Sequence, residues 1–447
     1  MPVWGFNRIY MIKKNILLII LLSSFHLVFA QQASDSTHKN FYNFHFQATI
    51  ISQTYLPFSA PYSGQNSLKT GGDTENSLTA TFFFGTRLWK NASLYANPEM
   101  SGGAGVSKAT GLAGFTNGEI YRVGDPKPAI YFARLYFNQK ISLSHQNTYT
   151  EDGLNQIVEK KPSRYLNLSF GKFSVADYYD LNRFSHDPRS SFLNWSLMSN
   201  GAWDYPANTR GYTYAGILEF ISPAWSVRLS TAAVPTEANG QELEYRINKA
   251  HSETLEGEHS FKMGSQSGIL RFLAFRTVAN MGNYALATSS IHPDITQTRE
   301  YGRTKLGLGI NWEQNINSTL GFMFRASFND GKNETWAFTE IDRSISTAFV
   351  QKGNLWNRPN DMAGLALVVN GLSPEHKNYL AAGGYGFIIG DGQLRYGTEN
   401  ILEAHYNFSV FKSFNLSPDY QVVLNPGYNK DRKGPIHFFA IRAHIEL

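Results

Sequence analysis

Apolar and polar residues alternate with a period of two along most of the chain. Residues 77–89 show the pattern well: one side is small or polar, and the other consists of Leu78, Ala80, Phe82, Phe84 and Leu88. The same alternation returns in residues 305–313 and 320–329. Successive side chains of a β-strand point to opposite faces, so the pattern predicts many strands that each have one apolar face.

The connections between the predicted strands alternate between short turns and long loops. Short turns are expected at residues 90–91, 222–224, 264–268, 315–318 and 412–415. Long loops are expected after the first strand (43–55) and after the third, and near residues 173–209, 234–255, 280–301, 373–398 and 425–435. This alternation gives about sixteen strands when residues 383–397 are taken as loop. Two connections, 144–163 and 350–360, are longer than the other short turns.

An outer-membrane barrel and a soluble β-sandwich both explain such strands, but they use the two faces differently. In a sandwich the apolar faces form the core. In a barrel they meet lipid, and the polar faces line a water-filled lumen. The alternating connection lengths favour an all-β, transmembrane antiparallel barrel of about sixteen strands, with short periplasmic turns and long extracellular loops. Trp89, Trp225 and Trp312 lie near strand ends, where the aromatic girdles of such barrels occur.

The last predicted strand, residues 436–447, supports closure of the barrel. Its apolar positions alternate with polar or small ones up to the final residue: Phe439, Ile441, Ala443, Ile445 and Leu447. The first and last strands of a barrel must pair with each other. The strand also resembles the C-terminal signal by which the barrel-insertion machinery recognises its substrates, although that signal usually ends in Phe.

The N-terminal residues have the features of a secretory signal peptide. Lys13 and Lys14 precede an apolar run, and Val28-Phe29-Ala30 provides the small residues that signal peptidase accepts, so cleavage is expected after Ala30. Met1 and Met11 are both possible initiators. The mature chain, residues 31–447, is then expected to form a single barrel domain in the bacterial outer membrane, after export through the periplasm. No second run of about 18 apolar residues follows, so no membrane-spanning helix is expected.

Composition argues against several classes of function. The 447-residue chain has no Cys, which excludes disulfides and thiolate chemistry. Its formal net charge of +5 comes without a basic stripe, so nucleic acid is not an expected partner. No G-x-S-x-G, H-E-x-x-H or phosphate-binding glycine loop is present, so we expect no enzyme activity and no cofactor. Asp177, Asp180 and Asp187 could supply calcium ligands, but they lack the spacing of a calcium loop. A calcium site there is therefore the less favoured interpretation.

Charged residues on the polar faces of the predicted strands are candidates for lining the pore. Ionic side chains are costly against lipid, so they should point into the lumen. There they either form ion pairs that stiffen the wall or form a selective constriction, and one residue can do both. The candidates are Arg87, Glu99, Arg134, Glu219, Arg228 and Arg325. Arg271 and Arg276 fall on opposite faces of one strand and remain unassigned.

Residues 171–208 combine four Asp with several aromatic residues. The strand count makes this stretch the third long extracellular loop, and we expect it to fold toward the lumen, by analogy with general porins. Aromatic rings there are suited to stack on sugars while polar groups bind hydroxyls; alternatively, the rings pin the loop to the wall. The candidate sugar contacts are Asp177, Tyr178, Tyr179, Asp180, Arg189, Trp195, Trp203 and Asp204.

Three long stretches resemble the carbohydrate-selective porins of the OprB type. They contain GKFSVADYYDLNRFSHDPRSSFLNWSL with GAWDYPANTRGYTYAG (171–216), PEMSGGAGVSKATGLAGFTNGE (98–119) and ENILEAHYNFSVFKSFNLSPDYQVVLNPGYN (399–429). The resemblance implies a barrel of about sixteen strands that passes mono- or short oligosaccharides into the periplasm by passive diffusion. A general porin is the alternative, and a hydrolase at the barrel rim is a weaker one.

The same interpretation names the expected partners. These are small sugars, outer-membrane lipid with lipopolysaccharide, and the insertion machinery that reads residues 436–447. The sequence allows a monomer or a homotrimer.

Overall fold

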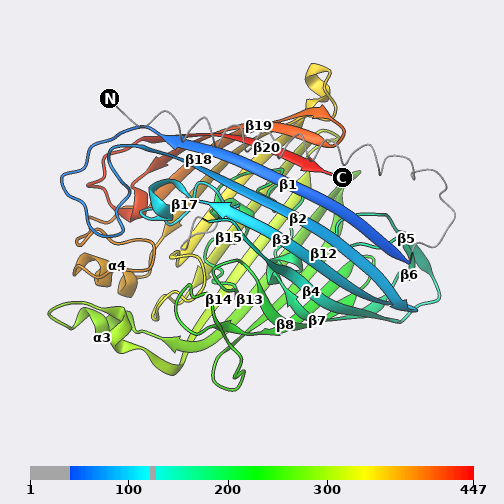
Figure 1. The fold of residues 1–447 in the computed structure, drawn as a ribbon, viewed down its shortest axis with the longest axis horizontal. Helices are drawn as coiled ribbons and strands as arrows, with labels where there is room; N and C mark the ends of the chain where they lie inside the picture. The colour runs from blue at the N-terminus through cyan, green and yellow to red at the C-terminus, as the bar shows by residue number, and fades with distance from the viewer. Residues whose placement is uncertain (1–40, 121–126) are drawn as a thin grey trace. The chain divides into compact units, whose positions relative to one another are not determined.

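The structure is a computed structural model that describes residues 41–120 and 127–447. Sixteen of its strands form one closed barrel (Figure 1). The first eight barrel strands are β1 (Tyr42–Tyr55), β2 (Asp73–Trp89), β3 (Ala92–Gly103), β4 (Ala129–Ser142), β7 (Tyr165–Phe173), β8 (Thr213–Ile221), β9 (Trp225–Ala232) and β12 (His251–Met263). The other eight are β13 (Gln266–Met281), β14 (Glu300–Asn315), β15 (Leu320–Asn329), β16 (Arg343–Lys352), β17 (Met362–Gly371), β18 (Glu399–Phe411), β19 (Phe414–Leu424) and β20 (Ile436–Glu446). The predicted barrel is confirmed, whereas the predicted signal peptide lies outside the described residues.

The barrel closes between its first and last strands. β1 and β20 pair antiparallel from Gln47 opposite Glu446 to Tyr55 opposite Phe438. Every barrel strand therefore has a partner on both sides, and no edge strand is left with unpaired backbone groups. This agrees with the expectation that residues 436–447 form the closing strand.

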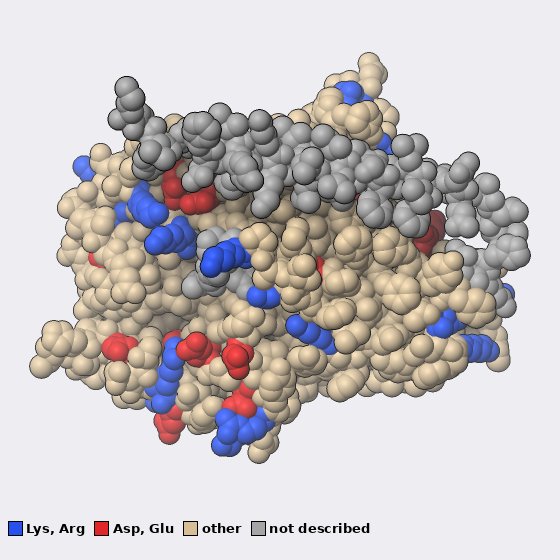
Figure 2. Space-filling view, viewed as in Figure 1, with Lys and Arg blue, Asp and Glu red and all other residues tan. Residues whose placement is uncertain are grey.

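The outer face of the barrel wall is apolar. On β2, the side chains of Phe82 and Phe84 are 45% and 44% exposed, whereas Thr81 and Phe83 are buried. Figure 2 shows a stretch of uncharged surface between the middle and the right end of this view, whereas most of the visible charged side chains lie over its left half. An apolar wall that faces outward fits lipid and not water, so the sandwich alternative is wrong. No helix in the described part of the chain is long and apolar enough to cross a membrane.

The connections differ at the two ends of the barrel, as the sequence predicts. At one end, two-residue turns join β2 to β3, β12 to β13 and β18 to β19. At the other end, long loops carry α3 (Tyr284–Thr288) and α4 (Pro374–Ala381), which lie together at the left of Figure 1. The long loops also contain η1 (Val106–Ala109), η2 (Val175–Asp177), α2 (Trp195–Met198), β10 (Val234–Pro235), β11 (Leu243–Glu244), η3 (Ile295–Thr298) and η5 (Pro426–Tyr428).

Two connections at the short-turn end are longer than the rest. They correspond to the two long connections that the sequence predicts at residues 144–163 and 350–360. Residues 143–164 form a small hairpin of β5 (Asn147–Thr150) and β6 (Glu159–Pro162), visible at the right of Figure 1. We call this segment the turn hairpin. Residues 353–361 form the helical turn η4 (Gly353–Trp356) and a following bend.

The long loops pack on one another through buried polar groups. Glu340, in the loop between β15 and β16, accepts hydrogen bonds from the backbone N–H groups of Ile388 and Ile389 (2.8 and 2.9 Å). Burial raises the pKa of the Glu340 carboxyl to about 7, and the charge of Glu334 adds to the effect, while His376 and these two hydrogen bonds oppose it. The folded loops therefore favour the protonated carboxyl more than an unfolded chain does.

We expect the packing of the loops around Glu340 to become less stable as the pH rises through about 7. The pKa is higher in the folded state than in the unfolded state, so the stabilisation is complete at low pH and is lost above the folded pKa. Between pH 6 and pH 8 the shift corresponds to an approximately tenfold fall in hydrogen-exchange protection of the Ile388 and Ile389 amides. Glu340→Gln should remove this pH dependence. A wild-type protection factor that stays constant over this range would contradict the prediction.

Candidate functional site

The loop between β7 and β8, residues 174–212, folds into the barrel, and we call it the inner loop. Its polar side chains satisfy much of its own backbone. Ser174 and Asp177 form a reciprocal cap at η2, and the Asn194 side chain accepts from Ser196 N at the start of α2. Asn182 and Asp187 each accept a hydrogen bond from a backbone N–H two residues later. Such local bonds let an irregular segment enter the lumen without unpaired backbone groups.

Arg325 on β15 is the central anchor of the inner loop. Its guanidinium donates to Asp180 Oδ1 (3.1 Å), to Ser185 Oγ (2.7 Å) and to the carbonyl oxygens of Asp180 and Leu197 (2.9 and 2.6 Å). The Arg325 side chain is fully buried. One cation therefore ties together three separate turns of the loop.

Further wall residues from β12 to β20 hold the loop on the same side of the barrel. Glu313 accepts from the backbone N–H and the guanidinium of Arg183 (2.7 and 2.8 Å). Glu403 accepts from the N–H groups of Leu193 and Asn194. Arg442 donates to the carbonyl oxygens of Pro188 and Ser191. These bonds press the inner loop against the wall formed by the second half of the chain.

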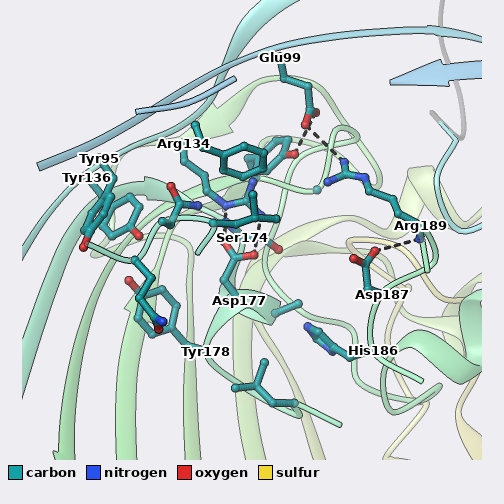
Figure 3. A pocket seen from close by; sticks show the side chains of 18 of the residues that line it. Tyr95, Glu99, Arg134, Tyr136, Ser174, Asp177, Tyr178, His186, Asp187 and Arg189 are labelled. Atoms are coloured by element: carbon teal, nitrogen blue, oxygen red, sulfur yellow. Dashed lines mark hydrogen bonds and ion pairs between the residues drawn. The ribbon is translucent and has the colours of Figure 1, made fainter. Parts of the chain in front are cut away.

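Fewer contacts connect the loop to the opposite wall. Arg134 on β4 makes a bidentate pair with Asp177, with nitrogen to oxygen distances of 2.7 and 2.6 Å. Arg189 reaches Glu119 and Glu99. Figure 3 shows that these pairs lie around an open space, with Glu99 and Arg134 on one side and the loop residues His186 and Asp187 on another.

That space is a cavity of about 590 Å³ between the inner loop and the first half of the barrel wall. Among the described residues, its barrel-strand lining comes from β1 to β4, β7 and β8, together with the inner loop and the turn hairpin. The cavity follows from the unequal anchoring, because the loop is fastened densely to the far wall and bridged only at a few points to the near one.

Tyrosines and ion pairs surround the middle of the cavity. The hydroxyls of Tyr131 and Tyr212 donate to Glu99 Oε1 (2.7 and 2.9 Å), and Thr81 donates to Glu99 Oε2 (2.7 Å). The guanidinium of Arg210 lies 4.1 Å from the centre of the Tyr131 ring. The site thus offers aromatic faces beside fixed hydrogen-bonding groups, an arrangement that suits a solute with both apolar faces and hydroxyls.

A profile of the carbohydrate-selective porin family OprB matches residues 67–447. The chain belongs to this family. A comparison with curated protein sequences found no match. The family and the barrel place this OprB-family porin in the outer membrane and indicate a channel rather than an enzyme.

Solved structures share the fold of this chain. OprB of Pseudomonas putida at high pH superposes with a TM-score of 0.68 at 15% identity, covering 91% of this chain and 94% of that one. The low-pH structure of the same protein gives a TM-score of 0.50 at 13% identity, covering 91% and 92%. The channel DcaP of Acinetobacter baumannii gives 0.50 at 10% identity, covering 91% and 97%. At these identities the likeness shows the shared barrel.

The cavity of this porin brings together about half of the residues predicted from the sequence. Those that line it are Glu99, Arg134, Asp177, Tyr178, Arg189, Trp195 and Glu219. Arg228 lies beside them in the wall, where it pairs with Glu219, Glu256 and Glu258. Arg87 is not part of the lining and donates instead to the carbonyl oxygen of Val158 in the turn hairpin (3.0 Å).

Four predicted sugar contacts do not reach the cavity. The side chains of Tyr179, Asp180, Trp203 and Asp204 are at most 1% exposed. They belong to the inner loop and are buried in its packing. Arg325 is buried in the same way. These residues fasten the loop, which is the alternative that the sequence left open for its acids and rings.

The structure adds residues that strand parity did not identify. Tyr131 is one, because the register between β3 and β4 shifts at Asn97 and Pro98. This bulge turns both Ala133 and Arg134 away from the outer surface, so counting back from Arg134 would place Tyr131 on the wrong face. Arg271 is buried and pairs with Glu258, whereas Arg276 is half exposed.

The three carboxylates considered for calcium do not converge. Asp177 pairs with Arg134, and Asp180 pairs with Arg325. Within the described ranges, no group of three or more His, Asp or Glu side chains is arranged to hold a metal ion.

Proposed function

We propose that this porin lets neutral mono- or short oligosaccharides diffuse passively along the cavity between the inner loop and the β1–β8 wall. The observation that carries the proposal is the charge balance of the lining. It contains the cations Arg134, Lys140, Lys161, Arg189 and Arg210 and the anions Glu99, Glu119, Glu159, Asp177, Asp187 and Glu219. Opposite charges interspersed in this way produce little net field, so the passage has no strong preference for ions of one sign.

The aromatic residues of the lining give sugars an advantage over other neutral solutes. Tyr131 and Tyr178 are partly exposed and offer ring faces for the C–H surfaces of a sugar, beside donors and acceptors for its hydroxyls, and the buried Tyr212 and Trp195 complete the aromatic lining. Binding must stay weak for the solute to leave, because a channel that holds its solute tightly does not conduct it. The proposal therefore includes no energy source and no high-affinity site.

Single-channel recording tests the proposal directly. Purified protein in a planar bilayer should show an ion current that millimolar glucose or a short maltooligosaccharide reduces, while a charged solute of similar size has less effect. Size-limited leakage that no sugar reduces would instead identify a general porin. Lipid or peptide hydrolysis by the purified protein would point to the rim-hydrolase alternative.

Tyr131→Leu should weaken the sugar block about fivefold. Loss of one aromatic face costs roughly 1 kcal/mol of interaction, which corresponds to this factor in the dissociation constant. Titration of the current with the best blocking sugar measures it. Phe132→Leu is the matched control, because Phe132 is the next residue on the same strand and is 52% exposed on the outer face. If the two variants change the sugar block equally, Tyr131 does not contact the solute.

The remaining partners follow from the same proposal. We infer that β20 carries the signal for the barrel-insertion machinery, that the outer wall contacts lipid and lipopolysaccharide, and that the precursor is cleaved after Ala30. N-terminal sequencing of the membrane-inserted protein tests the cleavage site. Light scattering in detergent distinguishes a monomer from a homotrimer.

A further inference from the structure

The turn hairpin is longer than the barrel requires. β4 and β7 remain paired to the end of the ladder, where Ser142 lies opposite Tyr165 and Leu143 N donates to Arg164 O (2.9 Å). A two-residue turn is enough to join strands at this point. The intervening residues 144–163 are therefore not needed to join the two strands.

The tip of the turn hairpin enters the barrel instead of extending away from it. The buried amide of Asn43 donates to the carbonyl oxygens of Gly153 and Gln156 (both 2.9 Å). The fully buried Asn97 donates to Asn155 Oδ1 (2.9 Å). Both asparagines point inward from the wall, on β1 and β3, so the tip lies within the barrel mouth.

Apolar and ionic contacts hold the descending part of the turn hairpin in the same place. Ile157 is 2% exposed and belongs to the buried cluster that contains Tyr95 and Tyr136 of the wall. Glu159 forms an ion pair with Lys140 of β4, and both side chains are largely buried. With the hydrogen bond from Arg87 of β2 to Val158 O, the hairpin is thus fixed to β1, β2, β3 and β4 by contacts of different kinds.

The turn hairpin also lines the cavity at its short-turn side. The lining residues from this segment are Thr150, Leu154, Asn155, Gln156, Ile157, Glu159 and Lys161. The inner loop approaches the cavity from the long-loop end of the barrel, and the turn hairpin approaches from the opposite end. A solute that passes the inner loop meets the turn hairpin next.

We propose that residues 153–161 of the turn hairpin, its tip and the start of β6, are a second selectivity element on the periplasmic side of the pore. It narrows the exit and presents amides and Lys161 to the hydroxyls of a neutral sugar. This inference rests on the proposed function, because it assumes that solute uses the cavity. The inner loop and the turn hairpin then act in series, and each sets a separate size limit.

The other long connection at this end shows that length alone does not produce such an element. In residues 353–361, Arg358 pairs with Asp361, and Trp356 Nε1 donates to Tyr406 Oη (2.9 Å). No residue of this segment is part of the cavity lining in the described structure. Residues 353–361 therefore serve as a control: they lie at the same end of the barrel as the turn hairpin but do not contact the cavity.

Single cysteines test the proposal without disturbing the fold, because the chain has no Cys of its own. Leu154→Cys labelled with the anionic reagent sulfonatoethyl methanethiosulfonate should lower the single-channel conductance at least twofold. Tyr149→Cys is the matched control on the same hairpin, since Tyr149 is 76% exposed and does not line the cavity. Complete labelling of Leu154→Cys, verified by mass spectrometry, with unchanged conductance would overturn the proposal.

A deletion provides the second measurement. Replacing residues 144–163 by Asn-Gly should raise the conductance several-fold and admit larger oligosaccharides, whereas shortening residues 353–361 should change neither. Unchanged conductance and size limit after the deletion of residues 144–163 would contradict the inference. The sugar block of the unaltered protein remains an independent readout. If sugars block but labelling has no effect, only the hairpin inference fails; if labelling reduces the current but no sugar blocks, only the proposed function fails.

Discussion

Arg325→Met should release the inner loop and raise the single-channel conductance several-fold. The substitution removes the guanidinium that bonds Asp180, Ser185 and Leu197 at once. The buried carboxylate of Asp180 then keeps hydrogen bonds from neutral groups, such as the amides of Asn200 and Asn311, and loses its cation. Leaving one partner of a buried ion pair uncompensated costs about 3–5 kcal/mol, which exceeds what the remaining bonds of one turn supply.

The conductance distribution in planar bilayers measures the effect of Arg325→Met. A released loop should give larger and noisier openings, together with loss of the sugar block. Arg276→Met is the control, because Arg276 lies on β13, two strands away from β15, and its half-exposed side chain forms a surface pair with Glu253. Channels of ordinary conductance in a correctly folded Arg325→Met protein would show that the other anchors hold the loop without it.

Strand parity and connection lengths were enough to predict the barrel and the position of the inner loop. The fifth barrel strand, β7, and the third long loop lie where the alternation places them. Both features depend on residues close together in the sequence, because one face of every strand must meet lipid and each short turn joins two consecutive strands. The register shift at Asn97 and Pro98 was not visible in the pattern, and it hid Tyr131 from the list of pore residues.

The roles of the loop residues depend on partners distant in the chain, which composition does not reveal. Asp177 and Asp180 are alike in sequence, yet Asp177 lines the cavity with Arg134, and Asp180 is buried under Arg325. The turn hairpin was missed for a similar reason. Its strands, β5 and β6, have four residues each. Only the contacts that Asn43 and Asn97 make with the residues between these strands show that the segment turns inward.

Asp204→Ala should separate the end of the inner loop from the loop between β15 and β16. The Asp204 carboxylate accepts from the backbone N–H groups of Trp336 and Ala337 (both 2.7 Å) and lies 3.5 Å from Lys305 Nζ. The carboxylate and the ammonium are both fully buried. Removal of the acid leaves a buried cation and two N–H groups without this acceptor, at a cost of about 3 kcal/mol.

Hydrogen exchange at the Trp336 and Ala337 amides measures this loss. A cost of about 3 kcal/mol corresponds to exchange that is roughly a hundredfold faster through local opening. Asp187→Ala is the matched control in the same loop, because Asp187 is exposed and its carboxylate caps only the N–H of Arg189. If Asp204→Ala leaves the Trp336 and Ala337 amides as protected as in the parent, the two loops are held together by apolar packing around Trp203 and Phe338, and the carboxylate is dispensable. If exchange rises while the barrel strands stay protected, the entrance of the pore opens independently of its wall.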